Sequence, residues 1–158
     1  MRLTFEKFKK YLNDIEENLF NYKTPKFGFT LDPCADHVNH KCATYYTKEQ
    51  NGLVHDWAEE RVFCKPPYGE EIGKLVQKSL EESRKPNTLV VMLIPARTDT
   101  KYFHDYIYGK AEIRFIRGRL KFGNSKTAAP FPSMVVIFKN KEEKSHEGNT
   151  HTGNPKPH

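Results

Sequence analysis

The sequence predicts an α/β fold: one domain with a mostly parallel sheet, an antiparallel edge and helices on both faces. Short apolar runs alternate along the chain with segments whose apolar residues recur at helical spacing. The predicted strand over 88–94 is continuously apolar after Thr88, which is typical of a strand covered on both faces of a parallel sheet. Two late extended segments, 111–122 and 134–138, have short connections, which favours antiparallel pairing at an edge.

Composition bounds the kinds of partner that suit the chain. Its 158 residues suffice for one domain with a substantial core. A net charge of +6 with 13% aromatic residues suits a polyanion that stacks, such as nucleic acid, although basic charge also serves solubility alone. The longest apolar run, residues 89–96, is too short to cross a membrane, and no signal-type apolar core follows Met1. We therefore expect a soluble cytoplasmic protein, taken to be a monomer.

The first elements are a helix, a break and a strand. Apolar residues at helical spacing predict an amphipathic helix over 3–20. Thr24-Pro25 breaks the chain, and alternation over 27–31 predicts a strand that ends at Asp32-Pro33. Residues 34–51 look irregular. They contain four potential zinc ligands whose spacing matches no usual pair of motifs, so zinc remains an alternative and no metal is expected: Cys34, His37, His40 and Cys42.

A second strand, Arg61–Cys64, stops at two prolines that precede Tyr68. Adjacent prolines fix the backbone and remove two N–H donors, so the chain leaves the strand in one rigid direction. The turn is either a seat for a planar ligand or a rigid corner with a packed tyrosine. The later predicted elements are a helix over 70–84, a strand over 88–94, a short helix over 101–108, strands over 111–116 and 134–138, and a disordered tail over 140–158.

A set of short segments, taken together and in one fixed order, is specific enough to indicate a protein family. They are Phe29–Asp36, Asn39, Lys41-Cys42, Gly52-Leu53, Asp56-Trp57, Phe63–Gly69, Leu93–Thr100, Phe103–Asp105, Phe115–Phe122 and Ala129–Ser133. In this order they resemble the phage-type DNA N6-adenine methyltransferase family, over roughly residues 24–139. The expected organisation is then an N-terminal helix over 1–23, a Rossmann-like methyltransferase domain over 24–139 and the tail.

The resemblance implies a function and a set of site residues. The expected activity is methyl transfer from S-adenosylmethionine to a flipped adenine of DNA, as in phage or restriction-modification enzymes, in the host cytoplasm if the gene is carried by a phage. The expected cofactor residues are Thr24, Pro25, Asp32, Pro33, Asp36 and Asn39. The expected catalytic residues are Lys65, Pro66, Pro67 and Tyr68, with the Pro66 carbonyl accepting from the adenine amino group and Tyr68 stacking on the base.

Basic residues near the late strands are candidates for DNA contacts. They are Arg97, Arg117, Arg119 and Lys121. Arginines at exposed strand ends pair well with phosphates. The alternative is a solvated basic face, with Arg97 in an ion pair with Asp99 or Asp105.

Two departures from the family pattern bear on activity. Lys65 stands where the family shows Asn or Asp, and a lysine ammonium has three donors and no acceptor. By analogy with losing one transition-state hydrogen bond, we expect a rate about 10²–10³-fold lower. A desolvated, neutral Lys65 would accept, but only if its pKa falls by several units. Only residues 26–28 separate Thr24-Pro25 from Phe29, where relatives carry a longer segment, which could remove part of the cofactor pocket's wall unless helix 3–20 replaces it.

Three alternatives to an active or impaired enzyme therefore stay open. The first is a non-catalytic family member that binds DNA or cofactor. The second is a chain whose position 65 was changed to stop turnover. The third is a small zinc-bound nucleic-acid protein built on Cys34–Cys42.

Overall fold

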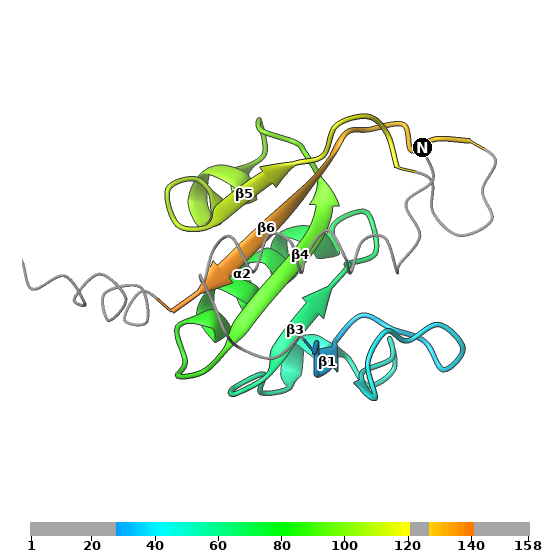
Figure 1. The fold of residues 1–158 in the computed structure, drawn as a ribbon, viewed down its shortest axis with the longest axis vertical. Helices are drawn as coiled ribbons and strands as arrows, with labels where there is room; N and C mark the ends of the chain where they lie inside the picture. Colours follow the sequence, from blue (N-terminus) through cyan, green and yellow to red (C-terminus); the bar gives the residue numbers. More distant parts are fainter. Residues whose placement is uncertain (1–27, 121–126, 141–158) are drawn as a thin grey trace, which may run out of the picture.

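The computed structural model describes residues 28–120 and 127–140. They form a six-stranded sheet in the order β2-β1-β3-β4-β6-β5 (Figure 1). The first three strands in sequence are β1 (Leu31–Asp32), β2 (Thr44–Tyr45) and β3 (Arg61–Cys64); they are followed by β4 (Leu89–Pro95), β5 (Glu112–Phe115) and β6 (Ser133–Lys139). β1 pairs in parallel with β2 and β3, and β3 with β4. β6 runs antiparallel to both β4 and β5, so the predicted parallel sheet with an antiparallel edge is confirmed.

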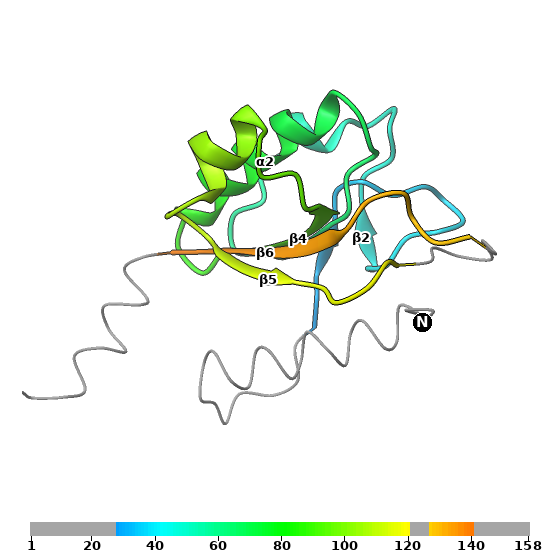
Figure 2. The ribbon, with the colours of Figure 1, turned by 90° about the horizontal axis from the view of Figure 1, so that it is seen from above.

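The helices that the structure describes are α2 (Glu71–Ser83), the 3-10 turn η1 (Gly52–Val54) and the π-helix η2 (Phe103–Ile107). α2 and η2 lie on one face of the sheet and pack against each other (Figure 2). The predicted helix 3–20 and the tail beyond residue 140 lie outside the described residues. No helix in the described part of the chain is long and apolar enough to span a membrane.

The core lies between α2 and the two long central strands. All seven residues of β4 are buried, as its continuous apolar run predicts. The buried face of α2 presents Ile72, Leu75, Val76 and Leu80, and the only tryptophan, Trp57, is fully buried beside it. Glu82 of α2 accepts a hydrogen bond from the Trp57 backbone N–H at 3.2 Å, so the helix also holds the segment that leads into β3.

Two sequence predictions need correction. The first strand is displaced: β1 covers Leu31–Asp32, although the Thr30 N–H still bonds the Arg61 carbonyl at 2.8 Å. Residues 34–51 are not wholly irregular, because β2 forms there and η1 follows. A backbone hydrogen bond from Tyr46 N–H to the Asp32 carbonyl (3.0 Å) continues this pairing past two-residue strands, which are too short to show alternation in a sequence.

The strand order brings several chain turns to one edge. The parallel strands β1, β3 and β4 end there, at Asp32, Cys64 and Pro95. The antiparallel strand β6 begins there, because Ser133 pairs with Pro95. Ligands of open α/β sheets bind at the carboxyl ends of the strands, which makes this edge the place to look for a site.

Candidate functional site

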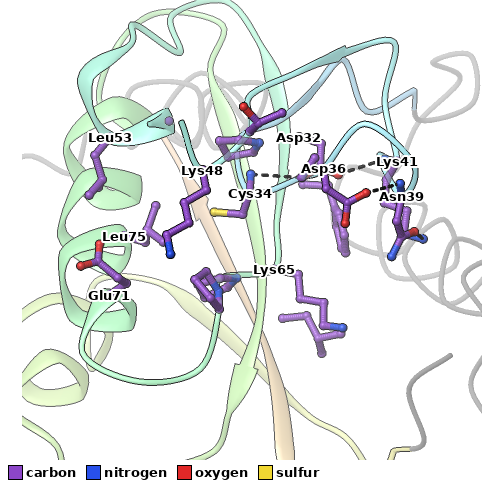
Figure 3. Close-up of a pocket in the computed structure, with 18 of the residues that line it drawn as sticks. Asp32, Cys34, Asp36, Asn39, Lys41, Lys48, Leu53, Lys65, Glu71 and Leu75 are labelled. Carbon is purple, nitrogen blue, oxygen red and sulfur yellow. Dashed lines mark hydrogen bonds between the residues drawn. The ribbon is translucent and has the colours of Figure 1, made fainter. Parts of the chain in front are cut away.

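A cavity of about 1010 Å³ opens at this edge (Figure 3). Eight of the residues predicted for the site line it: Asp32, Pro33, Asp36, Asn39, Lys65, Pro66, Pro67 and Tyr68. The two predicted groups, which follow β1 and β3, therefore share one cavity. Arg97, Arg117 and Arg119 do not line it. Thr24, Pro25 and Lys121 lie outside the described residues.

Asp32 is the best-buried acid of the cavity, with 3% of its surface exposed. Its two carboxylate oxygens accept the backbone N–H groups of Cys34 (3.3 Å) and Lys41 (2.9 Å). Burial raises the pKa of Asp32, against the opposing effect of these hydrogen bonds and of the Lys41 charge. The carboxylate thus fixes both ends of the loop over residues 34–41.

That loop carries polar groups into the cavity. One oxygen of Asp36 accepts the backbone N–H groups of Val38 (2.9 Å) and Asn39 (2.5 Å), and Asn39 Oδ1 accepts from Lys41 Nζ at 2.7 Å. In Figure 3, Asn39 and Lys41 lie on one side of the cavity and Glu71 and Leu75 of α2 on the other.

The sequence did not single out much of the wall. The lining residues that it did not assign to the site are Cys34, Ala35, Lys41, Thr47, Lys48, Asn51, Gly52, Leu53, Phe63, Glu71, Leu75, Leu93 and Leu120. The Asn51-Gly52 pair does signal a turn, and Asn51 Oδ1 accepts the Leu53 N–H there (3.2 Å). The sequence does not show that this turn packs closely against the loop after β1. In the folded chain, a Cβ added to Gly52 would stand 2.4 Å from the Pro33 carbonyl oxygen.

The turn after β3 supplies a cation and an aromatic ring. Lys65 is half-buried, and burial lowers its pKa; the nearby Lys41 lowers it further, while Asp32 opposes the shift. Tyr68 has 43% of its surface exposed, and its ring meets Phe131 edge-on, at 4.9 Å between ring centroids and 75° between planes. Burial raises the pKa of Tyr68 to about 12, so its hydroxyl is neutral at physiological pH.

The predicted DNA-contacting arginines lie near the cavity's rim or beyond it. Arg97 places its guanidinium over the Phe131 ring, 5.9 Å from the ring centroid. Within the described residues it forms no ion pair with Asp99 or Asp105, which were its alternative partners. Arg117 and Arg119 are exposed, and Arg119 Nη1 lies 3.5 Å from the Ala129 carbonyl oxygen.

The four potential zinc ligands have other partners. Cys34 Sγ lies 3.8 Å from Cys64 Sγ. His37 Nδ1 is 3.0 Å from the Tyr45 hydroxyl, and His40 stacks on the same tyrosine ring at 4.0 Å. Across the described ranges, no three His, Cys, Asp or Glu side chains gather in a way that would hold a metal ion.

Comparison with known proteins gives consistent matches. A family model described as "DNA N-6-adenine-methyltransferase (Dam)" matches residues 5–152. The "DNA N-6-adenine-methyltransferase" of Haemophilus phage HP1 is 33% identical over 131 residues, which cover 79% of this chain and 72% of the phage protein. The protein of the same name from Escherichia phage T1 is 31% identical over 101 residues, 63% of this chain and 42% of that protein.

A solved structure of a proposed methyltransferase from Thermoplasma acidophilum also matches. It has a TM-score of 0.39 and 12% identity, and the match covers 81% of this chain and 64% of that one. A score this low does not establish a common fold, so the assignment to the α/β class comes from the strand order described above.

Proposed function

Because the chain belongs to the DNA N-6-adenine-methyltransferase family, we propose that it transfers a methyl group from S-adenosylmethionine to the N6 amino group of adenine in DNA. One observation supports this more than any other. The loop after β1 and the Lys65-Pro66-Pro67-Tyr68 turn after β3 line the same cavity, so a methyl donor held by the loop would face a base held by the turn.

The cavity's chemistry fits the cofactor. S-adenosylmethionine, when bound, supplies an electrophilic methyl group. Its adenosine offers a flat apolar ring system and hydroxyl donors, and its amino-acid end carries an ammonium. Apolar side chains (Leu53, Leu75 and Leu93) suit the ring system. The carboxylates of Asp36 and Glu71 suit hydroxyl or ammonium donors, since ionised carboxylates only accept. Thr24 and Pro25 remain proposed contacts on the strength of the family resemblance.

We assign the adenine to the turn after β3. An adenine inside a duplex is out of reach, so the base must leave the stack before it reacts. The half-exposed ring of Tyr68 offers a stacking surface, and the Pro66 carbonyl, on a backbone fixed by two prolines, accepts one amino hydrogen. Both groups act by holding the amino nitrogen toward the methyl group.

Lys65 limits this arrangement. A charged Lys65 offers no acceptor to the second amino hydrogen and opposes the positive charge that develops on the attacked nitrogen. Its pKa is lowered, so the neutral amine, which does accept, becomes available at a lower pH than for an ordinary lysine. We therefore propose an enzyme that is slow at neutral pH and whose rate rises as Lys65 loses its proton.

DNA contacts belong on the rim. Arg117 and Arg119 are exposed in the segment after β5, on the side where β6 begins, and they suit phosphate oxygens. Because a charged Lys65 offers no acceptor, we also consider a second function: a family member that binds DNA and cofactor without transferring methyl.

The test separates these functions. The protein and its Lys65→Asn variant are incubated with S-adenosylmethionine and DNA from a host without adenine methylation, and the DNA nucleosides are analysed by mass spectrometry. Formation of N6-methyldeoxyadenosine is expected from both, faster from the variant, and none from Tyr68→Ala in the Lys65→Asn background.

Absence of product from wild type and variant alike would contradict the proposed activity. Calorimetry with S-adenosylmethionine and with DNA then decides what remains. Binding of either ligand would support the second function, a family member that binds without transferring methyl. If neither ligand binds, that function is contradicted as well.

A further inference from the structure

Three side chains, called here the Phe131 cluster, contact one another in series beside the cavity, although they come from three different turns. The Tyr68 ring follows β3, the Arg97 guanidinium follows β4, and the Phe131 ring precedes β6. These strand ends are adjacent because β3, β4 and β6 are neighbours in the sheet. Phe131 is the central member: it contacts Tyr68 edge-on at 4.9 Å and lies under Arg97 at 5.9 Å.

Phe131 sits on a segment that is tied down at both ends. On one side, the Ala129 N–H bonds the carbonyl of buried Leu120 at 2.8 Å. On the other, the Pro132 carbonyl accepts the Ala96 N–H at 2.8 Å and the Ser133 carbonyl accepts the Ile116 N–H at 3.1 Å. Phe131 itself stands between two prolines, which fix the backbone on either side of it.

Tyr68 lies on a turn of a different kind, between two prolines and a glycine. Gly69 follows it with φ near 133°, a conformation that side chains disfavour, and about two-fifths of the tyrosine surface is exposed. Pro66 and Pro67 fix the backbone from which the Tyr68 side chain starts, but they do not fix the tilt of its ring. An edge-to-face contact with a fixed ring sets that tilt, since aromatic pairs prefer this arrangement.

We propose that Phe131 is a positioning residue that fixes the Tyr68 ring for stacking on the target adenine. Phe131 does not line the cofactor cavity, so it acts through Tyr68 and not through the methyl donor. The assignment rests on the function proposed above. It adds Phe131, which precedes the antiparallel strand β6, to the residues proposed to hold the adenine.

The test is a double-mutant cycle on base stacking, which needs no turnover. The probes are an oligodeoxyadenylate strand of about 12 nucleotides and an abasic strand of the same length. The ratio of their affinities, called here the base preference, is measured for wild type, Phe131→Leu, Tyr68→Leu and the double variant. Phe131→Tyr serves as the conservative rescue. Phe115→Leu is the matched control, because Phe115 is an exposed phenylalanine of β5 that does not belong to the Phe131 cluster.

Phe131→Leu should lower the base preference by about twofold to tenfold, the range of an edge-to-face aromatic contact. In the Tyr68→Leu background the same change should have no further effect. Phe131→Tyr should keep the preference, and Phe115→Leu should leave it unchanged. Calorimetry with S-adenosylmethionine should give the same affinity for wild type and Phe131→Leu, which shows that the variant is folded.

An equal loss with and without Tyr68, or no loss at all, would overturn the proposal. So would a wild-type protein that binds both strands equally. Failure of the proposed function shows up separately, as absence of methylated DNA from the wild type and from Lys65→Asn, whatever the base preference is.

Discussion

A single methyl group added at Gly52 would disturb the wall of the proposed cofactor cavity directly. In Gly52→Ala, the new Cβ would stand 2.4 Å from the Pro33 carbonyl oxygen and 2.9 Å from Pro33 Cβ. To move the first contact from 2.4 to 3.0 Å, below which real Cβ contacts are essentially not seen, the two segments must separate by 0.6 Å. Both residues line the cavity, so this separation deforms its wall.

The turn that carries Gly52 cannot yield without loss. The Gly52 carbonyl accepts the indole N–H of fully buried Trp57 at 3.0 Å. Overpacking of this kind costs about 1–3 kcal/mol, and weakening the bond to a buried donor adds a cost of similar size. We expect Gly52→Ala to lose about 2–4 kcal/mol of unfolding free energy and to bind S-adenosylmethionine more weakly.

Urea unfolding followed by the fluorescence of Trp57, the only tryptophan, measures the first effect. Gly28→Ala is the matched control, because among the described residues its Cβ would meet nothing within 4 Å. An unfolding midpoint for Gly52→Ala equal to that of wild type would refute the reasoning from this close approach.

Three further predictions concern a thiol, a buried acid and the basic rim. Cys34 is the one half-buried thiol among the described cysteines and lines the cavity, so saturating S-adenosylmethionine should slow its alkylation by iodoacetamide, with Cys34→Ser as the unlabelled control; labelling at an unchanged rate would place the cofactor elsewhere. Burial raises the pKa of Glu82, but hydrogen bonds from two lysines outweigh it and hold the pKa below its usual value. Its contribution to stability should therefore be full at neutral pH and lost as the pH falls through the folded-state value, so the stability deficit of Glu82→Gln should shrink in acid; a constant deficit would contradict this sign. Arg117→Ala or Arg119→Ala should reduce the slope of log affinity for duplex DNA against log salt by about 0.9 each, whereas Arg84→Ala, beyond the other end of α2, should leave it unchanged. Equal slopes for all three variants would rule out the rim as the phosphate contact.

Much of the sheet was predictable because its long strands are unambiguous in sequence. The segment Arg61–Cys64 is bounded by polar residues and two prolines, and it forms β3 as predicted. The apolar run that became β4 has no alternation, which indicates burial on both faces. β2 was not predicted because its two residues are too few to show alternation, and their pairing with β1 is a tertiary contact.

The site was predictable in part and for a different reason. Asp32 ends β1 and Tyr68 follows β3, and the sequence predicts where both strands end, so placing these two residues at one edge needed only the parallel order. Phe131 belongs to the family pattern, but the sequence alone predicts no role for it, since its contact with Tyr68 depends on the order β3-β4-β6, which no local pattern shows. Likewise, the half-burial of Lys65 and the nearby charge of Lys41 depend on the tertiary structure, and neither is visible in the spacing of residues.

The rate of methyl transfer by Lys65→Asn relative to wild type tests the central claim most directly. An asparagine restores the missing acceptor and removes the positive charge, so we predict transfer at least about tenfold faster at neutral pH. The advantage should narrow as the pH rises, because the lowered pKa of Lys65 makes its neutral amine available. Lys65→Met, which removes the charge without supplying an acceptor, should not reach the rate of the asparagine variant. Equal rates for wild type and Lys65→Asn at neutral pH would contradict the account.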